Sequence, residues 1–277
     1  MRNIIAILGV FLTAAALGAE PVLQASKETY DYVPAMKEVT KKFKGTQGVI
    51  LLLGDSITYA NPNTSWARYG AGQTGEVKLF LKWAHANEKS EIDGWHLASV
   101  DVANGRSHTA SSGMTTGEFL AGGKNGLPSL ADILKKHNPQ MAIYMLGTND
   151  MRAGESAIAG AVANVEKALD AILAHNTIPI LSTIPPMKGK NPAIEKYNAE
   201  LKKLAEKKKI PLLDLFGELK AINPELDSWL QDGVHLTAGN AAAAPTEENF
   251  KKSGYLARCY FNVLKAMEVK AKVIDAK

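Results

Sequence analysis

The sequence predicts an α/β protein, a flavodoxin-like three-layer α/β/α sandwich built on a five-stranded parallel sheet. Two observations predict this fold. Five short runs of apolar residues recur along the chain, and each run is continuous rather than alternating, as in strands that are covered on both faces. Between these runs, apolar residues recur with helical spacing. Strands that alternate with helices in this way form a parallel sheet with helices on both faces.

The predicted elements follow one another regularly. The five predicted strands are residues 48–53, 98–103, 141–146, 178–184 and 211–215. Predicted helices, each with apolar residues on one face, cover residues 130–134, 158–172, 194–209 and 256–267. The sequence His137-Asn138-Pro139 is expected to end the first of these helices just before the third strand. Because no linker divides the series, we expect one domain over residues 47–270.

The N-terminus has the pattern of a secretory signal peptide, which we place at residues 1–19. Arg2 precedes an apolar stretch over residues 4–17, and the small residues Gly18 and Ala19 offer a cleavage site. The stretch is shorter than the ~20 residues that a membrane span needs, so we expect a secreted or periplasmic protein without stable membrane insertion. Residues 20–46 are expected to form an N-terminal extension, packed on the outside or partly mobile, and residues 271–277 a C-terminal tail.

The composition is that of an ordinary globular protein, with 46% hydrophobic and 22% charged residues among 277. The only cysteine, Cys259, lies among apolar residues, so we expect it to be buried and without an internal disulfide partner. Much of the basic excess lies in the lysine-rich residues 202–209, on the polar face of a predicted helix. This stretch lacks the interleaved aromatic residues of nucleic-acid binders, so we expect no nucleic-acid partner.

Polar segments with catalytic side chains begin where apolar runs end. Gly54-Asp55-Ser56 directly follows the first predicted strand, and Asp232 and His235 come after the fifth. Because the carboxyl ends of parallel strands meet at one edge of a sheet, these residues are expected to converge. A serine hydroxyl becomes a nucleophile only when a base removes its proton. We therefore predict Ser56 as nucleophile, His235 as its base and Asp232 as the carboxylate that orients the imidazole.

Two further segments of this kind, residues 112–116 and 147–150, supply hydrogen-bond donors. Acyl transfer needs donors aimed at the negative charge that develops on the carbonyl oxygen. The predicted donors of this oxyanion hole are the backbone N–H groups of Ser56 and Gly113 and the side-chain amide of Asn149. Glycine suits position 113 because it has no Cβ to block a close approach of the substrate.

Ser56, Gly113, Asn149 and His235, in this order, resemble the four marker positions of the SGNH hydrolases, also called GDSL esterases and lipases. The resemblance covers residues 48–237 and implies the SGNH hydrolase fold and a serine esterase. Two features depart from the family pattern. Met114 stands where the family often has an aspartate, and residues 238–249 come between His235 and the closing helix. The inserted segment is a candidate for shaping one side of the substrate pocket.

Two other patterns are not expected to bind a cofactor or a metal ion. Residues 70–75 match the dinucleotide-binding fingerprint, and Asp93 lies near the expected acidic position. However, this segment does not follow a buried strand, as that motif must. The remaining histidines lack the spacing of metal ligands: His85, His96, His108, His137 and His175.

Together these observations favour a secreted serine esterase that hydrolyses short-chain acyl esters, such as acetyl esters on small molecules or carbohydrates. A lipolytic esterase or a thioesterase is an alternative, since the sequence fixes neither the acyl chain nor the alcohol. Outside the enzymes, the alternative is a non-catalytic binding module on the same fold. The complete set of Ser56, Asp232 and His235 argues against such a module, because binding alone does not require all three.

Overall fold

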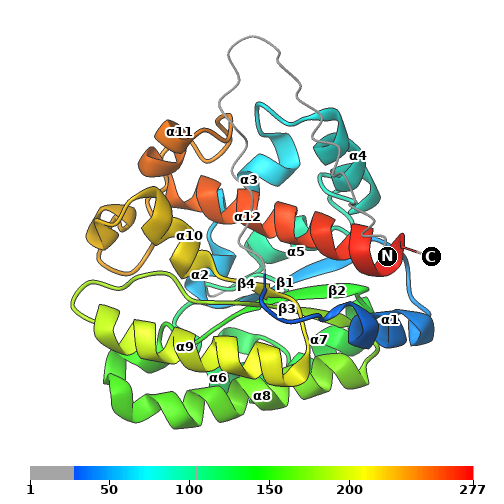
Figure 1. The fold of residues 1–277 in the computed structure, drawn as a ribbon, viewed down its shortest axis with the longest axis horizontal. Coiled ribbons are helices and arrows are strands. Elements are labelled where there is room, and N and C mark those ends of the chain that lie inside the picture. The colour runs from blue at the N-terminus through cyan, green and yellow to red at the C-terminus, as the bar shows by residue number, and fades with distance from the viewer. Residues whose placement is uncertain (1–27, 104, 277) are drawn as a thin grey trace, which may run out of the picture.

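The computed structural model describes residues 28–103 and 105–276, and it confirms the predicted α/β/α architecture (Figure 1). Its parallel sheet has four strands in the order β1-β2-β3-β4. The strands are β1 (Ile50–Gly54), β2 (Met141–Met145), β3 (Ile178–Ser182) and β4 (Leu212–Leu213). Every residue of these strands is buried, as expected for a sheet that is covered on both faces.

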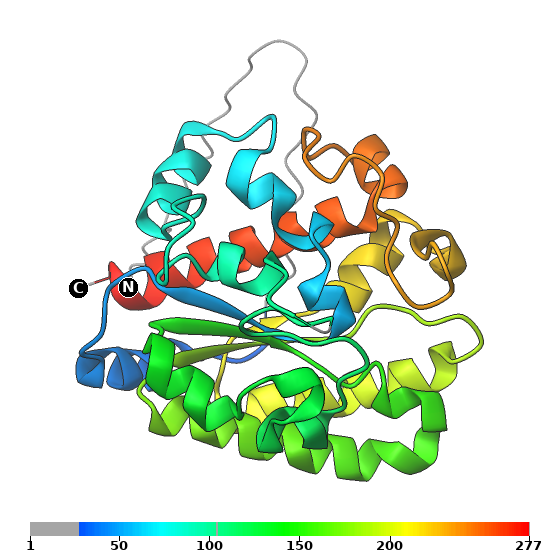
Figure 2. The same ribbon diagram turned by 180° about the vertical axis from the view of Figure 1, so that it is seen from behind.

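Helices form one layer on each face of the sheet, as the two opposite views show (Figures 1 and 2). The layer above the sheet in Figure 1 contains α2 (Ser56–Tyr59), α3 (Pro62–Tyr69), α4 (Gly75–Trp83), α5 (Gly94–Ser99), α10 (Leu215–Ile222), α11 (Glu247–Lys252) and α12 (Gly254–Val269). The layer below contains α6 (Thr116–Ala121), α7 (Leu130–His137), α8 (Ile158–Ala174) and α9 (Asn191–Lys208). One more helix, α1 (Val33–Lys42), precedes the first strand. Short 3₁₀ turns are η1 (Lys124–Gly126), η2 (Asp150–Ala153), η3 (Glu155–Ala157) and η4 (Leu226–Trp229). The π-helical turn η5 (Lys270–Ile274) continues α12.

The prediction of a strand over residues 98–103, and with it of a fifth strand in the sheet, is wrong. The segment begins inside α5, whose N-terminus is capped by the side chain of Asp93. This helix lies so close to β1 that a Cβ at Gly94 would be 1.8 Å from a carbonyl oxygen of the strand. The place beside β1 is taken by a single parallel bridge between Gly54 and Ala110. Ala98 is therefore buried in a helix that packs on the sheet, whereas Val100 is only half-buried and Val102, beyond the end of the helix, is 40% exposed.

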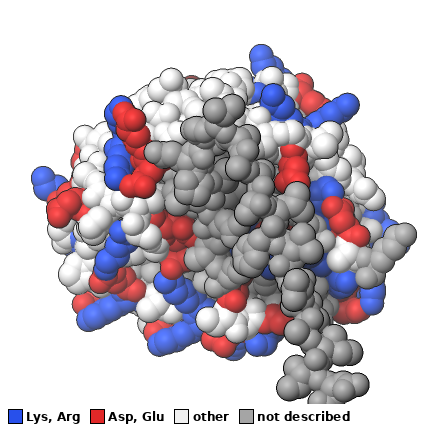
Figure 3. Space-filling model, turned by 45° about the horizontal axis from the view of Figure 1, so that its top comes forward, with Lys and Arg blue, Asp and Glu red and all other residues white. Residues whose placement is uncertain are grey.

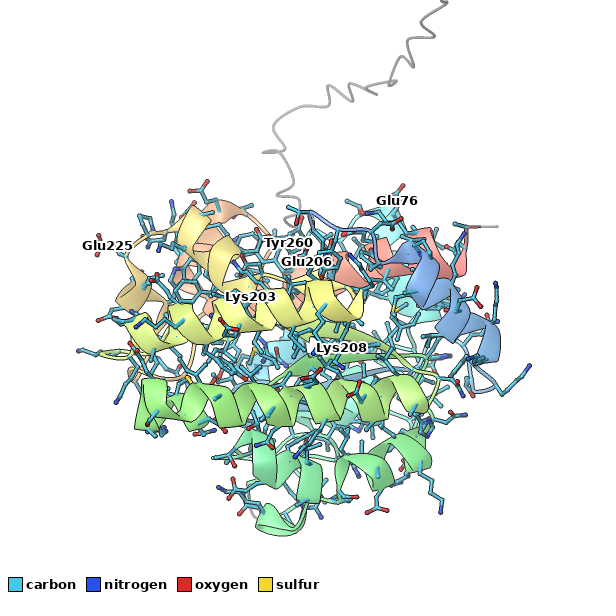
Figure 4. All side chains as sticks on the ribbon, turned by 60° about the horizontal axis from the view of Figure 1, so that its bottom comes forward. Glu76, Lys203, Glu206, Lys208, Glu225 and Tyr260 are labelled. Carbon is cyan, nitrogen blue, oxygen red and sulfur yellow. The ribbon has the colours of Figure 1, made fainter. Side chains whose placement is uncertain are left out.

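The four predicted helices are confirmed as α7, α8, α9 and α12. α7 ends where Asn138 adopts the left-handed conformation. α9 buries its apolar face, and its polar face, seen in Figure 4, carries lysines that pair with acids of α8, such as Lys208 with Asp170 at 2.6 Å. Basic and acidic side chains also lie side by side on the face drawn in Figure 3. Cys259 is buried in α12 as expected, and it is unpaired.

The described part of the N-terminal segment packs beside β4. Glu28 accepts a hydrogen bond from the backbone N–H of Leu212 at 2.8 Å, and it pairs with the buried Lys265 of α12 at 3.2 Å. The predicted signal peptide, residues 1–19, lies outside the described residues. In the part of the chain that the structure describes, no helix combines the length and apolarity needed to cross a membrane.

Candidate active site

Ser56 lies at the point where β1 ends and α2 begins. Asp55 caps this helix, since its Oδ1 accepts the backbone N–H of Ile57 at 3.0 Å. The chain therefore turns directly from a buried strand into a one-turn helix, of which Ser56 is the first residue. Ser56 is only partly buried, so its hydroxyl is accessible at the carboxyl end of the sheet, where ligands bind in folds of this kind.

His235 and Asp232 come from the loop between η4 and α11, and they reach Ser56. The distance from His235 Nε2 to Ser56 Oγ is 2.8 Å, and that from His235 Nδ1 to Asp232 Oδ2 is 2.7 Å. The other oxygen of Asp232 accepts the backbone N–H groups of Val234 at 3.0 Å and of His235 at 2.7 Å. The structure thus brings the three predicted residues together in one line of hydrogen bonds.

The partners of the His235 ring determine which nitrogen carries the proton. A carboxylate only accepts, so Nδ1 donates to Asp232 and Nε2 is left to accept the hydrogen of the Ser56 hydroxyl. Burial alone would raise the pKa of Asp232, but hydrogen bonds from His235 and Val234 lower it overall. Asp232 is therefore ionised at neutral pH. This arrangement can take a proton from Ser56 while a carboxylate stabilises the protonated ring.

Gly113 lies in the loop that follows the bridge at Ala110. Its φ of +67° falls in the left-handed region, which favours glycine over residues with a Cβ. Lys124 donates to the Gly113 carbonyl at 2.6 Å and pairs with Glu118 at 3.0 Å. The loop is therefore held by a side chain of η1 that is itself anchored to α6.

Asn149 joins the Gly113 loop to the Ser56 turn. Its Nδ2 donates to the Met114 carbonyl at 2.9 Å and lies 3.5 Å from Asp55 Oδ2. Among the described residues, the backbone N–H groups of Ser56 and Gly113 donate to no protein acceptor. In the predicted donor set, the backbone N–H groups of Ser56 and Gly113 are therefore unengaged. The Asn149 amide contacts the loops that carry both of these groups.

A contact of Asp150 was not predicted from the sequence. Its carboxylate accepts both the backbone N–H of Thr116 at 3.0 Å and the Thr116 hydroxyl at 2.7 Å. Thr116 is the first residue of α6, so the contact fixes the loop around Met114 to the end of β2. The available signal was the carboxylate next to Asn149, but nothing in the spacing identifies a partner 34 residues away.

Two buried charges beneath the serine turn were also not predicted. Arg258 of α12 is 1% exposed, and its guanidinium donates to the Ile57 carbonyl at 2.6 Å and to the Thr58 hydroxyl at 2.8 Å. Burial raises the pKa of the fully buried Asp55 to about 6, while the Ile57 N–H and the charge of Arg258 act in the opposite direction. Burial lowers the pKa of Arg258 only to about 10, so it remains charged at neutral pH. The available signal was an arginine among the apolar residues of the last predicted helix.

Comparison with known proteins adds the family. The sequence profile of the GDSL-like lipase/acylhydrolase family matches residues 52–241, well over half of the chain. The protein belongs to this family. The resemblance to the SGNH hydrolases is thereby confirmed. The matched range contains every residue predicted for the site.

Individual relatives of this GDSL-family protein are distant. A multidomain esterase from Ruminococcus flavefaciens is 27% identical over 212 residues, which cover 69% of this chain and 26% of the relative. The chain thus spans about a quarter of the length of that relative. The solved structure of an acetyl esterase variant with an acetate ion is 18% identical and has a TM-score of 0.50. The match covers 78% of this chain and 98% of the acetyl esterase. Axe2, an acetylxylan esterase from Geobacillus stearothermophilus, is 18% identical with a TM-score of 0.47, over 80% of this chain and 96% of its own.

The segment that matches the dinucleotide-binding fingerprint, residues 70–75, joins α3 to α4 and follows no strand. It contacts the inserted segment, residues 238–249, because Ala71 donates its N–H to the Ala242 carbonyl at 2.8 Å. Gly72 lies against Ala244 and Pro245 of the same segment. In this GDSL-family protein the insertion therefore packs on the connection between two helices.

Proposed function

We propose that this protein is a secreted serine esterase in which Ser56, His235 and Asp232 form a catalytic triad. The observation that carries the proposal is the line of two short hydrogen bonds from the Ser56 hydroxyl through the His235 ring to the Asp232 carboxylate. In this arrangement an unprotonated ring nitrogen accepts the hydrogen of the serine hydroxyl, and a carboxylate holds the opposite nitrogen. Such an arrangement activates the hydroxyl for acyl transfer.

In the proposed reaction, Ser56 Oγ attacks the carbonyl carbon of the ester while His235 Nε2 takes its proton. The tetrahedral intermediate collapses, the proton passes from His235 to the leaving alcohol, and the acyl group stays on Ser56 as an ester. Water then attacks this acyl-enzyme with His235 again as the base, which releases the acid and restores the serine. Asp232 keeps Nδ1 protonated and stabilises the charged ring without becoming protonated itself.

The proposed oxyanion hole consists of the Ser56 and Gly113 N–H groups and the Asn149 amide. Of the two N–H groups of Asn149 Nδ2, one is engaged by the Met114 carbonyl. The contact to Asp55 Oδ2, at 3.5 Å, is long for a hydrogen bond, so the second N–H can turn to the stronger acceptor that a developing oxyanion provides.

A first test is covalent labelling. A fluorophosphonate probe reacts with an activated serine, so we expect one label per chain, located at Ser56 by peptide mass spectrometry. A chain that hydrolyses no ester and stays unlabelled would instead support a non-catalytic binding module on this fold.

We further propose that the substrate carries a short acyl group, such as acetyl, on a small molecule or a carbohydrate. Acetyl esters are the first substrates to test because the solved proteins with related folds include an acetyl esterase. A series of p-nitrophenyl esters from acetyl to decanoyl, followed by acetylated xylan, measures the preference. A maximum at the long chains would favour a lipolytic esterase instead.

Replacing Asn149 by alanine is expected to lower kcat by about 10²–10³-fold, as for the loss of one oxyanion donor elsewhere. KM for the same ester should change little, because the donor acts mainly on the negative charge of the transition state. Steady-state kinetics on p-nitrophenyl acetate measures both constants. An unchanged kcat would remove Asn149 from the proposed hole.

Export is proposed from the N-terminal sequence alone. The basic Arg2, the apolar residues 4–17 and the small residues Gly18 and Ala19 have the order of a cleavable signal peptide. Expression of the full chain with fractionation of the culture, followed by N-terminal sequencing, is expected to give an exported protein that begins after Gly18 or Ala19. An intact N-terminus in the cytoplasm would contradict export and leave the proposed chemistry untouched.

A further inference from the structure

Arg152 is an exposed cation beside the candidate site, and its contact with Asn149 has no role in the proposed reaction steps. It lies in η2, three residues after Asn149, and its Nε donates to Asn149 Oδ1 at 3.3 Å. Among the described residues it forms no ion pair, unlike the nearby Lys196, which pairs with Glu155 at 2.6 Å. Its one polar contact within the described protein is therefore the side-chain oxygen of the proposed oxyanion donor.

This contact bears on the orientation of the Asn149 amide. An amide can occupy its site in two orientations that exchange the oxygen and the NH2 group. In the observed orientation, NH2 faces the Met114 carbonyl at 2.9 Å and the oxygen faces the Arg152 N–H. In the reversed orientation, the amide oxygen of Asn149 would face the Met114 carbonyl oxygen. The NH2 group of Asn149 would then face the N–H groups of Arg152.

The two contacts therefore reinforce each other, and only one of them is made by a charged group. The positive charge of Arg152 strengthens its contact with the Asn149 oxygen, which at 3.3 Å is longer than the contact with the Met114 carbonyl. The reversed amide would place an oxygen where the oxyanion develops, which would oppose the reaction rather than assist it.

We propose that Arg152 is a positioning residue, which holds the Asn149 amide with its NH2 group toward the substrate oxygen. This proposal rests on the esterase function proposed above. Arg152 acts through Asn149 and is not required to touch the substrate. Since it is exposed, its replacement is not expected to disturb folding.

The test is a double-mutant cycle on p-nitrophenyl acetate. Arg152→Met in the natural sequence is expected to lower kcat by about tenfold with KM nearly unchanged, less than the ~10²-fold that a 1 Å displacement of a catalytic group can cost. In an Asn149→Ala background the same substitution is expected to change kcat by less than about twofold, because the group that it positions is gone. Lys196→Met, the matched loss of an exposed cation, should leave kcat unchanged.

Two results would overturn the proposal while the esterase function stands. An equal loss of kcat from Arg152→Met in both backgrounds would mean that Arg152 acts independently of Asn149. An increase of KM with unchanged kcat would make Arg152 a substrate contact. If the natural protein neither hydrolyses esters nor reacts with the fluorophosphonate, the esterase function fails and this role of Arg152 fails with it.

Discussion

Ser56→Ala is expected to lower kcat/KM for p-nitrophenyl acetate by on the order of 10⁴- to 10⁶-fold and to abolish fluorophosphonate labelling. The substitution removes the oxygen that would carry the acyl group, and among the described residues no other hydroxyl donates to His235 Nε2. Folding should be unaffected, since only one oxygen is lost from a partly exposed side chain. Ser156→Ala, an exposed serine of η3, is the matched control and should retain full activity.

His235→Ala is expected to cause a loss of similar size, and the double variant Ser56→Ala/His235→Ala should be no worse than either single variant. The reason is that nucleophile and base act as one unit, so that removing either one removes the contribution of both. Losses that multiply in the double variant would show two independent functions. His235 would then not be the base for Ser56.

Arg258→Met is expected to lower the free energy of unfolding by about 3–5 kcal/mol, the largest effect on stability that we predict. The substitution leaves the Ile57 carbonyl and the Thr58 hydroxyl without their donor, and it leaves the buried Asp55 without the positive charge that offsets its own. Urea denaturation followed by circular dichroism measures the change. Lys252→Met on α11 removes an exposed ion pair and should cost at most about 1 kcal/mol.

The loss in Arg258→Met is expected to grow with pH. Burial raises the pKa of Asp55 in the folded protein from 3.8 to about 6. The stability contributed by the protonated carboxyl is therefore complete below about pH 4 and is lost as the pH rises to about 6. Without the charge of Arg258 this pKa rises further, so stability continues to fall above about pH 6.

Comparing unfolding at about pH 5 and about pH 8 tests this origin of the effect. The double variant Asp55→Asn/Arg258→Met should recover part of the stability, because asparagine caps a helix as well as aspartate does and carries no charge. An equal loss at both pH values, with no recovery in the double variant, would mean that Arg258 contributes only through its packing.

Much of the candidate site could be predicted from the sequence because its residues follow buried strands. Ser56 and Asn149 come after β1 and β2, and the parallel sheet brings their loops to one end. Asp232 and His235 are three residues apart, so their pairing follows from local geometry. The hydrogen bond between His235 and Ser56 spans 179 residues, and its prediction depended on the fold prediction being correct.

The strand over residues 98–103 was predicted wrongly because a short apolar run fits a buried helix as well as a buried strand, and residues 98 and 99 here belong to a helix. Residues 94–99 form α5, and the features that decide this are the cap at Asp93 and the close approach of Gly94 to β1. The cap was present in the sequence as the pair Asp93-Gly94, but such a pair also suits a turn. The second depends on tertiary packing and has no local signal.

The roles of Asp55 and Arg258 could not be predicted for a similar reason. Asp55 stood in the motif, but its complete burial depends on α12, which follows it by some 200 residues. Arg258 is a lone charged residue in an apolar helix, and such a pattern does not identify the group that it contacts. The sequence pattern therefore does not predict contacts such as those of Arg258, which join distant elements away from the ends of the strands.

The contact between Glu28 and β4 has a consequence for how copies of the protein behave toward one another. A strand at the border of a sheet offers unpaired backbone groups to which a strand of another molecule can attach, which is a common start of aggregation. Here the border strand has two residues, and the outward N–H of Leu212 is already occupied by the Glu28 carboxylate. With this N–H engaged and only two residues in the strand, this side of the sheet offers little free backbone for intermolecular pairing.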